Sequence, residues 1–226
     1  MDYQIFEAGD VALQSGATIR NCKLAYKTFG QLNARKDNAI VYPTWYSGQH
    51  YDNEWLIGPG MALDPATKFI IIPNMLGNGL SSSPSNTPEP YNGPRFPRIT
   101  AYDNVRLQHR LITDVFGIET LPLVTGWSMG ALQTFHWGAL YPDMVQRIAP
   151  FCGSAKCSRH NFVFIGDKIG ERDGSRHGAN TFRADQVFYA VGHTGERTDC
   201  RAGGNGAVHR RRLGLRQLEC GRAESV

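Results

Sequence analysis

One pentapeptide constrains the fold of this chain more than any other feature. Residues 126–130 read Gly-Trp-Ser-Met-Gly and stand directly between an apolar run and a segment of helical character. A serine between glycines, in the order strand, turn and helix, is typical of a strained turn that exposes the serine hydroxyl. The glycines fit because such a turn leaves no room for side chains. A strand-to-helix connector without chemistry is the alternative, and the flanking strand and helix disfavour it.

The first 150 residues predict alternating strands and helices. Expected helices run from Thr100 to about Phe116 and from Met129 to about Tyr141, and a loop rich in Ser and Pro spans 80–97. The later strands lack polar–apolar alternation, which indicates a sheet covered by helices on both faces. The sequence therefore predicts an α/β fold with a mostly parallel sheet. The expected strands are an antiparallel pair at 11–13 and 17–29, then runs at 39–42, 69–72, 121–125 and 145–151.

Composition excludes several classes of protein. Hydrophobic residues make up 41% and charged residues 19% of the chain, as in ordinary globular proteins. No apolar run approaches the roughly 18 residues of a membrane-spanning helix, and the N-terminus does not resemble a signal peptide. Five cysteines without a CxxC pair favour reduced thiols over a zinc site. We therefore expect a cytoplasmic protein with no metal and no membrane partner.

The predicted chemistry at the turn is acyl transfer, with Ser128 as the catalytic nucleophile. Its hydroxyl would stand at the carboxyl edge of the sheet, beside the N-terminus of the following helix. An oxyanion hole needs two backbone donors. The N–H of Met129, which follows the nucleophile, is the first candidate. The second is the N–H of Trp45, in the loop 43–48 after the strand 39–42. The side chains of Trp45 and Tyr46 are as well explained by simple packing.

A serine nucleophile also needs an acid and then a histidine later in the chain. His136 falls two turns into the helix after Ser128 and is predicted to be a packing or surface residue. His160 comes too early for the usual order. His177, His193 and His209 lie where no predicted strand presents them. The sequence leaves the base and the acid unassigned.

These residues resemble the homoserine O-acetyltransferase family, a branch of the α/β-hydrolase fold, over residues 15–165. The resemblance implies that Ser128 takes an acyl group from acyl-CoA and passes it to a hydroxyl, that of homoserine in the best-known members, in methionine biosynthesis. It implies small-molecule substrates, no bound cofactor, acyl-CoA as co-substrate, and leaves a homodimer open. The motifs that carry it are Ile57-Gly58-Pro59-Gly60, Phe69 to Asn74, Leu76-Gly77-Asn78-Gly79, Phe96 to Thr100, Asp103 to Arg106, Gly126 to Gln133, Trp137 and Tyr141-Pro142.

The chain departs from that family at two loops. Members usually read Gly-Gly-Ser-Met-Gly-Gly-Met-Gln at the serine turn, where this chain has Trp127, Ala131 and Leu132. They usually read His-Ala-Leu-Thr-Gly in the loop that occupies 43–48 here. Because these positions line the acyl pocket, a serine hydrolase of the esterase kind stays open as an alternative. A remnant without catalytic activity is the other.

After about residue 165 the character of the chain changes. Residues 166–226 are rich in glycine and arginine, with Lys168 the only lysine, and the family's helical lid, Asp and His are not recognisable. We expect a partial α/β-hydrolase domain over 1–165 and an irregular, disordered or out-of-frame tail over 166–226, with activity impaired by the missing triad members. The arginines are interspersed with acidic residues and form no known motif, so nucleic acid is not an expected partner.

Overall fold

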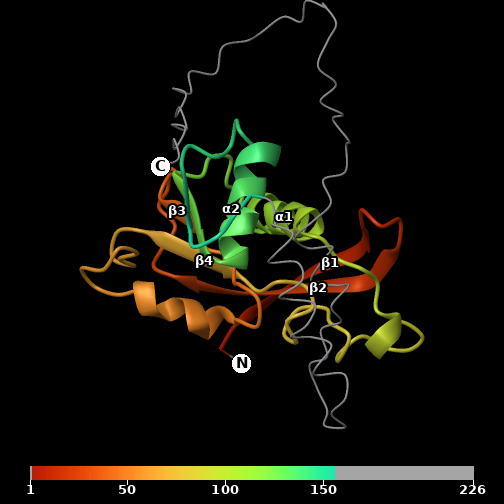
Figure 1. The fold of residues 1–226 in the computed structure, drawn as a ribbon. Coiled ribbons are helices and arrows are strands. Elements are labelled where there is room, and N and C mark those ends of the chain that lie inside the picture. The colour runs from red at the N-terminus through yellow and green to blue at the C-terminus, as the bar shows by residue number, and fades with distance from the viewer. Residues whose placement is uncertain (1, 156–226) are drawn as a thin grey trace, which may run out of the picture. The chain divides into compact units, whose positions relative to one another are not determined.

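The structure, a computed structural model, describes residues 2–155 and contains one six-stranded sheet within that range (Figure 1). The helices are η1 (His50–Leu56), η2 (Gly93–Arg95), α1 (Ala101–Arg110), η3 (Leu111–Val115) and α2 (Met129–Leu140). The strands are β1 (Gln4–Ala12), β2 (Thr18–Phe29), β3 (Ala39–Val41), β4 (Phe69–Pro73), β5 (Leu123–Trp127) and β6 (Ile148–Phe151).

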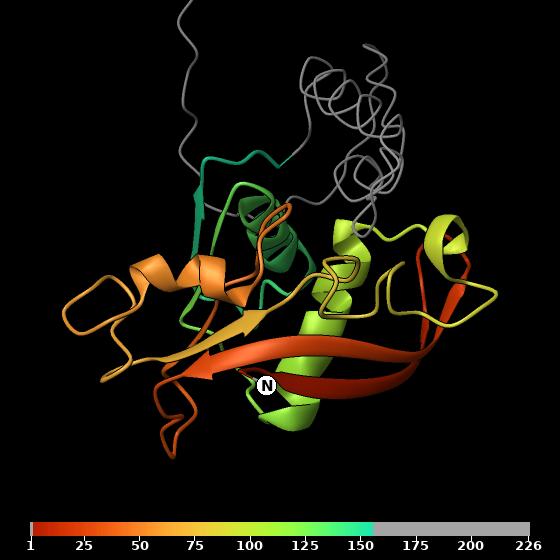
Figure 2. The same ribbon diagram turned by 90° about the horizontal axis from the view of Figure 1, so that it is seen from below.

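The strands lie in the order β1-β2-β4-β3-β5-β6. β1 and β2 form a long antiparallel hairpin (Figure 2), and β2 pairs antiparallel with β4. β3 is parallel to both β4 and β5, and β6 is parallel to β5. The prediction of a mostly parallel sheet is therefore confirmed. The carboxyl ends of the four parallel strands meet at one edge, which is where the loop after β3 and the turn after β5 begin.

Helices cover both faces of the sheet. α1 and α2 lie on one face and η1 on the other (Figure 1). Alternate residues of each strand supply the two cores, because successive side chains point to opposite faces. Val41 and Ile71 pack with the buried residues of α1 and α2, whereas Ile40 and Ile70 pack with those near η1. All four are at most 3% exposed, as expected for strands buried on both sides.

Helix α1 begins where the sequence predicts. Thr100 is its N-cap, and Thr100 and Asp103 form a reciprocal capping box. The helix continues as the single π-turn η3 and ends at Gly117, whose φ is +58°.

Three strands differ from their expected bounds. β6 begins at Ile148 rather than at residue 145, because Val145 forms only an isolated bridge with Leu121. β1 begins at Gln4 rather than at residue 11, because a register shift at Gly9 interrupts the period-2 pattern on which the prediction relied. β5 covers 123–127 rather than 121–125. Pro122 has no N–H for a ladder, and Leu121 forms only an isolated bridge with Val145. As a result, β5 runs without a break into Ser128.

None of the helices within residues 2–155 is long and apolar enough to cross a membrane. The predictions for the tail, including a domain boundary near residue 165, fall outside the described residues.

Candidate active site

Ser128 occupies the turn between β5 and α2 in a conformation that few residues adopt. Its φ is +53° and its ψ −116°, outside the regions that L-residues usually populate. Its N–H donates to the carbonyl of Phe151 at 2.9 Å, and its own carbonyl accepts from Leu132 N–H at 3.2 Å. The surrounding β6 and α2 therefore hold a strained backbone in place, as is common at functional turns.

Glycines next to Ser128 allow other backbone segments to approach closely. A Cβ added at Gly130 would lie 2.6 Å from the carbonyl oxygen of Pro43, in the loop after β3. A Cβ added at Gly153 would lie 2.5 Å from the carbonyl oxygen of Ser128. Only glycine permits contacts this short. The serine turn, the loop after β3 and the residues after β6 therefore meet at one place.

The loop after β3 is held at Thr44, which is fully buried. Its N–H donates to the Pro73 carbonyl at 3.3 Å, and its hydroxyl accepts from the Met75 N–H at 3.1 Å. Its carbonyl accepts from Gln133 Nε2, on α2, at 2.9 Å. Thr44 thus joins β4 and α2, the elements on either side of the loop.

The two predicted oxyanion donors lie on the segments that meet here. Met129 is the first residue of α2, and Trp45 follows Thr44 directly. Within residues 2–155 neither N–H donates a hydrogen bond. The Trp45 indole packs against Gly48, where an added Cβ would lie 2.9 Å from its Nε1.

Trp127 forms an exposed aromatic wall beside Ser128. Its ring lies edge-to-face against that of Trp55, on η1, with the centroids 5.9 Å apart. The two residues are 37% and 53% exposed, respectively. Exposed aromatics paired this way next to a strained serine are the kind of surface that contacts a ligand.

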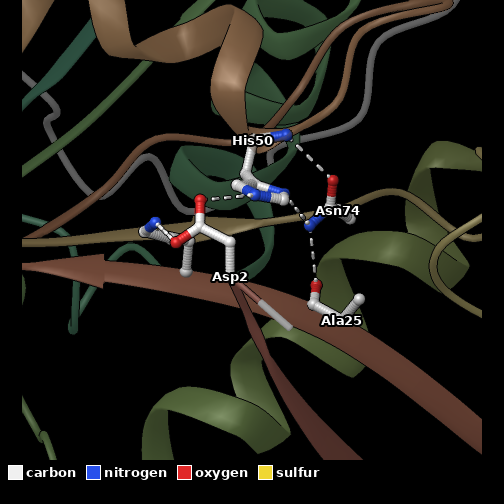
Figure 3. Close-up of polar contacts among 5 residues, drawn as sticks. Asp2, Ala25, His50 and Asn74 are labelled. Carbon is white, nitrogen blue, oxygen red and sulfur yellow. Dashed lines mark hydrogen bonds and ion pairs between the residues drawn. The ribbon is translucent and has the colours of Figure 1, made fainter.

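Asn74 fastens the start of η1 to the hairpin (Figure 3). Its Oδ1 accepts from the N–H of His50 and from Asn78 Nδ2, both at 3.0 Å, and its Nδ2 donates to the Ala25 carbonyl at 3.3 Å. These bonds fix which way the amide faces, so its other hydrogen points to His50 Nδ1, 3.3 Å away. Nδ1 must then accept, and the neutral ring carries its proton on Nε2.

This tautomer determines whether His50 could bind a metal ion together with nearby acidic residues. Atoms of Asp2, His50 and Glu54 that could bind a cation lie within 4.8 Å of one another. The protonated Nε2 of His50, 3.9 Å from the Asp2 carboxylate, has no lone pair to offer a metal. Lys27 also forms an ion pair with Asp2. The contacts of Asp2 with Lys27 and His50 therefore hold the first residues of the chain in place and do not form a metal centre.

The described histidines all have partners other than Ser128. His136 Nδ1 bonds the Leu132 carbonyl at 3.0 Å, and its side chain is partly exposed. His109 stacks on Tyr141 with the ring centroids 3.9 Å apart, and its pKa is lowered by burial. His50 contacts Asn74 as described above. The other predicted candidates lie outside the described residues; they are His160, His177, His193 and His209.

Sequence reasoning did not assign a role to the buried glutamines behind the site. Gln108 Nε2 donates to Gln133 Oε1 at 2.7 Å, and Trp137 Nε1 donates to Gln108 Oε1 at 2.9 Å. All three side chains are fully buried. The sequence could have predicted that Gln108 is buried, because it lies at helical spacing between the apolar residues Val105 and Leu111.

The fold and the strained serine define the class of protein. A family model described as alpha/beta hydrolase fold matches residues 48–180, and this chain belongs to that family. Among individual relatives, an ethyl acetate hydrolase of Pseudomonas veronii is 47% identical over 163 residues, which cover 72% of this chain and 47% of the relative. A homoserine O-acetyltransferase of Chlorobium chlorochromatii is 38% identical over 164 residues, covering 70% and 45%.

A solved structure gives the same result. That of the acetyl esterase MekB matches with a TM-score of 0.73 and 46% sequence identity, and covers 74% of this chain and 49% of that one. The chain spans about half the length of the curated relatives it matches. The expected membership of the α/β-hydrolase fold is confirmed, whereas the expected priority of the acetyltransferase branch is not.

Proposed function

We propose that this chain supplies the nucleophile and the oxyanion-binding backbone of a serine esterase acting on small acyl esters. The observation that carries the proposal is a positive-φ serine at the end of β5, with the N–H groups of Met129 and Trp45 unbonded within residues 2–155. The names of the acetyl esterase and ethyl acetate hydrolase relatives support a small ester as the substrate class.

The reaction would proceed through an acyl-enzyme. Ser128 Oγ attacks the ester carbonyl carbon while a base takes the hydroxyl proton, and the carbonyl electrons move to oxygen. The N–H groups of Met129 and Trp45 stabilise that oxyanion. Collapse expels the alcohol, which takes the proton from the base, and water then hydrolyses the acyl-serine. The described histidines have other partners, and in this fold the acid and the base follow the nucleophile in chain order.

The aromatic wall bears on the substrate class. Trp127, the residue before the nucleophile, and Trp55 present exposed apolar ring surface. Such a wall favours a compact apolar acyl or alkoxy group over a charged one, because aromatic surface cannot replace the water that a charge loses.

Acyl transfer from acyl-CoA to a hydroxyl, as in homoserine O-acetyltransferase, is the second candidate. It forms the same acyl-serine, and the acceptor hydroxyl replaces water in the second step. The 38% identical acetyltransferase relative supports it. The esterase has the stronger support, because the ethyl acetate hydrolase relative is 47% identical.

The test uses the full 226-residue chain and its Ser128→Ala variant with p-nitrophenyl acetate. We expect an acetyl adduct on the peptide containing Ser128 and release of p-nitrophenol, both abolished in the variant. Addition of homoserine separates the candidates: acetate alone indicates the esterase, and O-acetylhomoserine indicates the transferase. If Ser128 of the chain without substitutions acquires no acetyl group, both candidate functions are refuted.

A further inference from the structure

One peptide group connects the candidate oxyanion site to the interior of the molecule. The carbonyl of Thr44 and the N–H of Trp45 belong to the same trans peptide. In a trans peptide the C=O and the N–H are coplanar and point in opposite directions. Whatever holds the Thr44 carbonyl on one side therefore aims the Trp45 N–H toward the other.

Gln133 holds that carbonyl. Its Nε2 donates to Thr44 O at 2.9 Å, and the same nitrogen lies 3.4 Å from the Met129 carbonyl. Gln133 thus bonds the peptide of one candidate donor, Trp45, and the residue that carries the other, Met129. It lies on α2, one helical turn beyond Met129.

The Gln133 amide is itself fixed in orientation. Its Oε1 accepts from Gln108 Nε2 at 2.7 Å, and Gln108 Oε1 accepts from Trp137 Nε1 at 2.9 Å. An indole nitrogen only donates, so Gln108 must present its oxygen to Trp137 and its nitrogen to Gln133. Gln133 must then direct its own nitrogen toward Thr44. Trp137, which is fully buried, therefore sets the donor-to-acceptor direction of this series of hydrogen bonds.

We propose that Gln133 is a positioning residue that aims and polarises the Trp45 N–H for the oxyanion, an inference that rests on the proposed function. A hydrogen bond accepted by the carbonyl draws electron density from the peptide nitrogen, which makes the N–H a stronger donor. The oxyanion exists only after the nucleophile has attacked. Loss of Gln133 therefore lowers kcat and leaves KM nearly unchanged.

The first test separates orientation from activity. The chain has four tryptophans, so labelling with ¹⁵N-tryptophan gives a short set of backbone amide signals, and Trp45→Phe assigns the one of interest. We expect the Trp45 amide signal to shift in Gln133→Met. The matched control is Thr134→Val, which removes one hydrogen bond, to the Gly130 carbonyl, from the next buried residue of α2. A Trp45 signal that is unmoved in Gln133→Met, or that moves equally in the control, overturns the inference.

The second test measures catalysis. Gln133→Met is expected to lower kcat for p-nitrophenyl acetate by about tenfold to a hundredfold, at or below the cost of deleting one oxyanion donor. If the unchanged chain shows no acylation of Ser128, the proposed function fails, while the amide test still decides the orientation. A kcat that is unchanged in Gln133→Met, in an active chain, refutes the positioning role.

A third variant gives a signature that loss of stability alone would not produce. The glutamate of Gln133→Glu has the same shape and can still accept from Gln108, but when ionised it has no proton for the Thr44 carbonyl. When protonated it can donate again. The kcat of Gln133→Glu, relative to the unchanged chain at each pH, is expected to fall as pH rises through the pKa of that carboxyl. A ratio independent of pH contradicts the proposal.

Discussion

Gly126 and Gly130 touch across the serine turn: a Cβ added at Gly126 would lie 2.3 Å from both the carbonyl carbon and the carbonyl oxygen of Gly130. The last residues of β5 and the first turn of α2 therefore pack backbone to backbone on either side of Ser128. No side chain rotation can relieve a clash with backbone atoms, so the turn depends on glycine at position 126.

The first prediction follows from this contact. Gly126→Ala is expected to lower the free energy of unfolding by about 3 kcal/mol or more, because the added methyl forces β5 and α2 apart. Chemical denaturation measures the change. The control is Gly138→Ala, further along α2, where the nearest atom to the new methyl is Cγ2 of Ile148 at 3.3 Å. If both variants have the same stability, the turn is less tightly packed than its geometry indicates.

The second prediction concerns the start of α1. Thr100→Ala removes the hydroxyl that accepts from Asp103 N–H and donates to the Asp103 carboxylate at 2.8 Å. The expected loss in the free energy of unfolding is about 0.5–2 kcal/mol, the usual range for an N-cap residue. Thr100→Ser keeps the hydroxyl and is expected to recover most of that loss. Equal losses in the two variants would assign the effect to the missing methyl group instead.

The third prediction is a pH dependence of stability. Burial, and then the charge of Lys27, lower the pKa of His50 below its usual value of about 6.5, although Asp2 and Glu54 oppose the shift. The unfolded chain therefore binds a proton at a higher pH than the folded chain. The stability that neutral His50 contributes is present above pH 6.5 and is lost as pH falls below it.

The variant His50→Asn tests this dependence, because the asparagine keeps a polar atom near Asn74 but does not titrate. Urea denaturation at pH 7.5 and pH 5.5 gives the two free energies of unfolding. The decrease in the free energy of unfolding from pH 7.5 to pH 5.5 is expected to be smaller in the variant. The decrease that remains in the variant is assigned in part to His109, because burial also lowers the pKa of that histidine. An equal drop in the unchanged chain and the variant would exclude His50 as a source.

The fourth prediction contrasts two cysteines. Cys22 is fully buried on β2, and burial raises its pKa to about 11. Cys152 is exposed just after β6. Because only the thiolate reacts, iodoacetamide at pH 8 is expected to alkylate Cys152 and to leave Cys22 unmodified until the chain unfolds. Peptide mass spectrometry with and without urea measures both sites. Modification of native Cys22 at a comparable rate would show that β2 opens readily.

The sequence predicted the elements around Ser128 well, for a physical reason. Strand periodicity, helix caps and turn glycines are local properties, carried by residues within a few positions of one another. The strand before residue 126, the helix after it and the cap at Thr100 were predicted on that basis. The start of β1 was missed because the bulge at Gly9 changes which residues face the core, and only the pairing partner reveals the bulge.

What the sequence by itself determined is the α/β-hydrolase class and the placement of Ser128 between a strand and a helix. Only the tertiary structure decided that Gln133 bonds the Thr44–Trp45 peptide across 89 positions of sequence, and that Asn74 sets the tautomer of His50. The physical reason is that a hydrogen bond between distant segments depends on how parallel strands and their crossover helices bring them together. The local sequence around either residue does not indicate which distant residue it bonds.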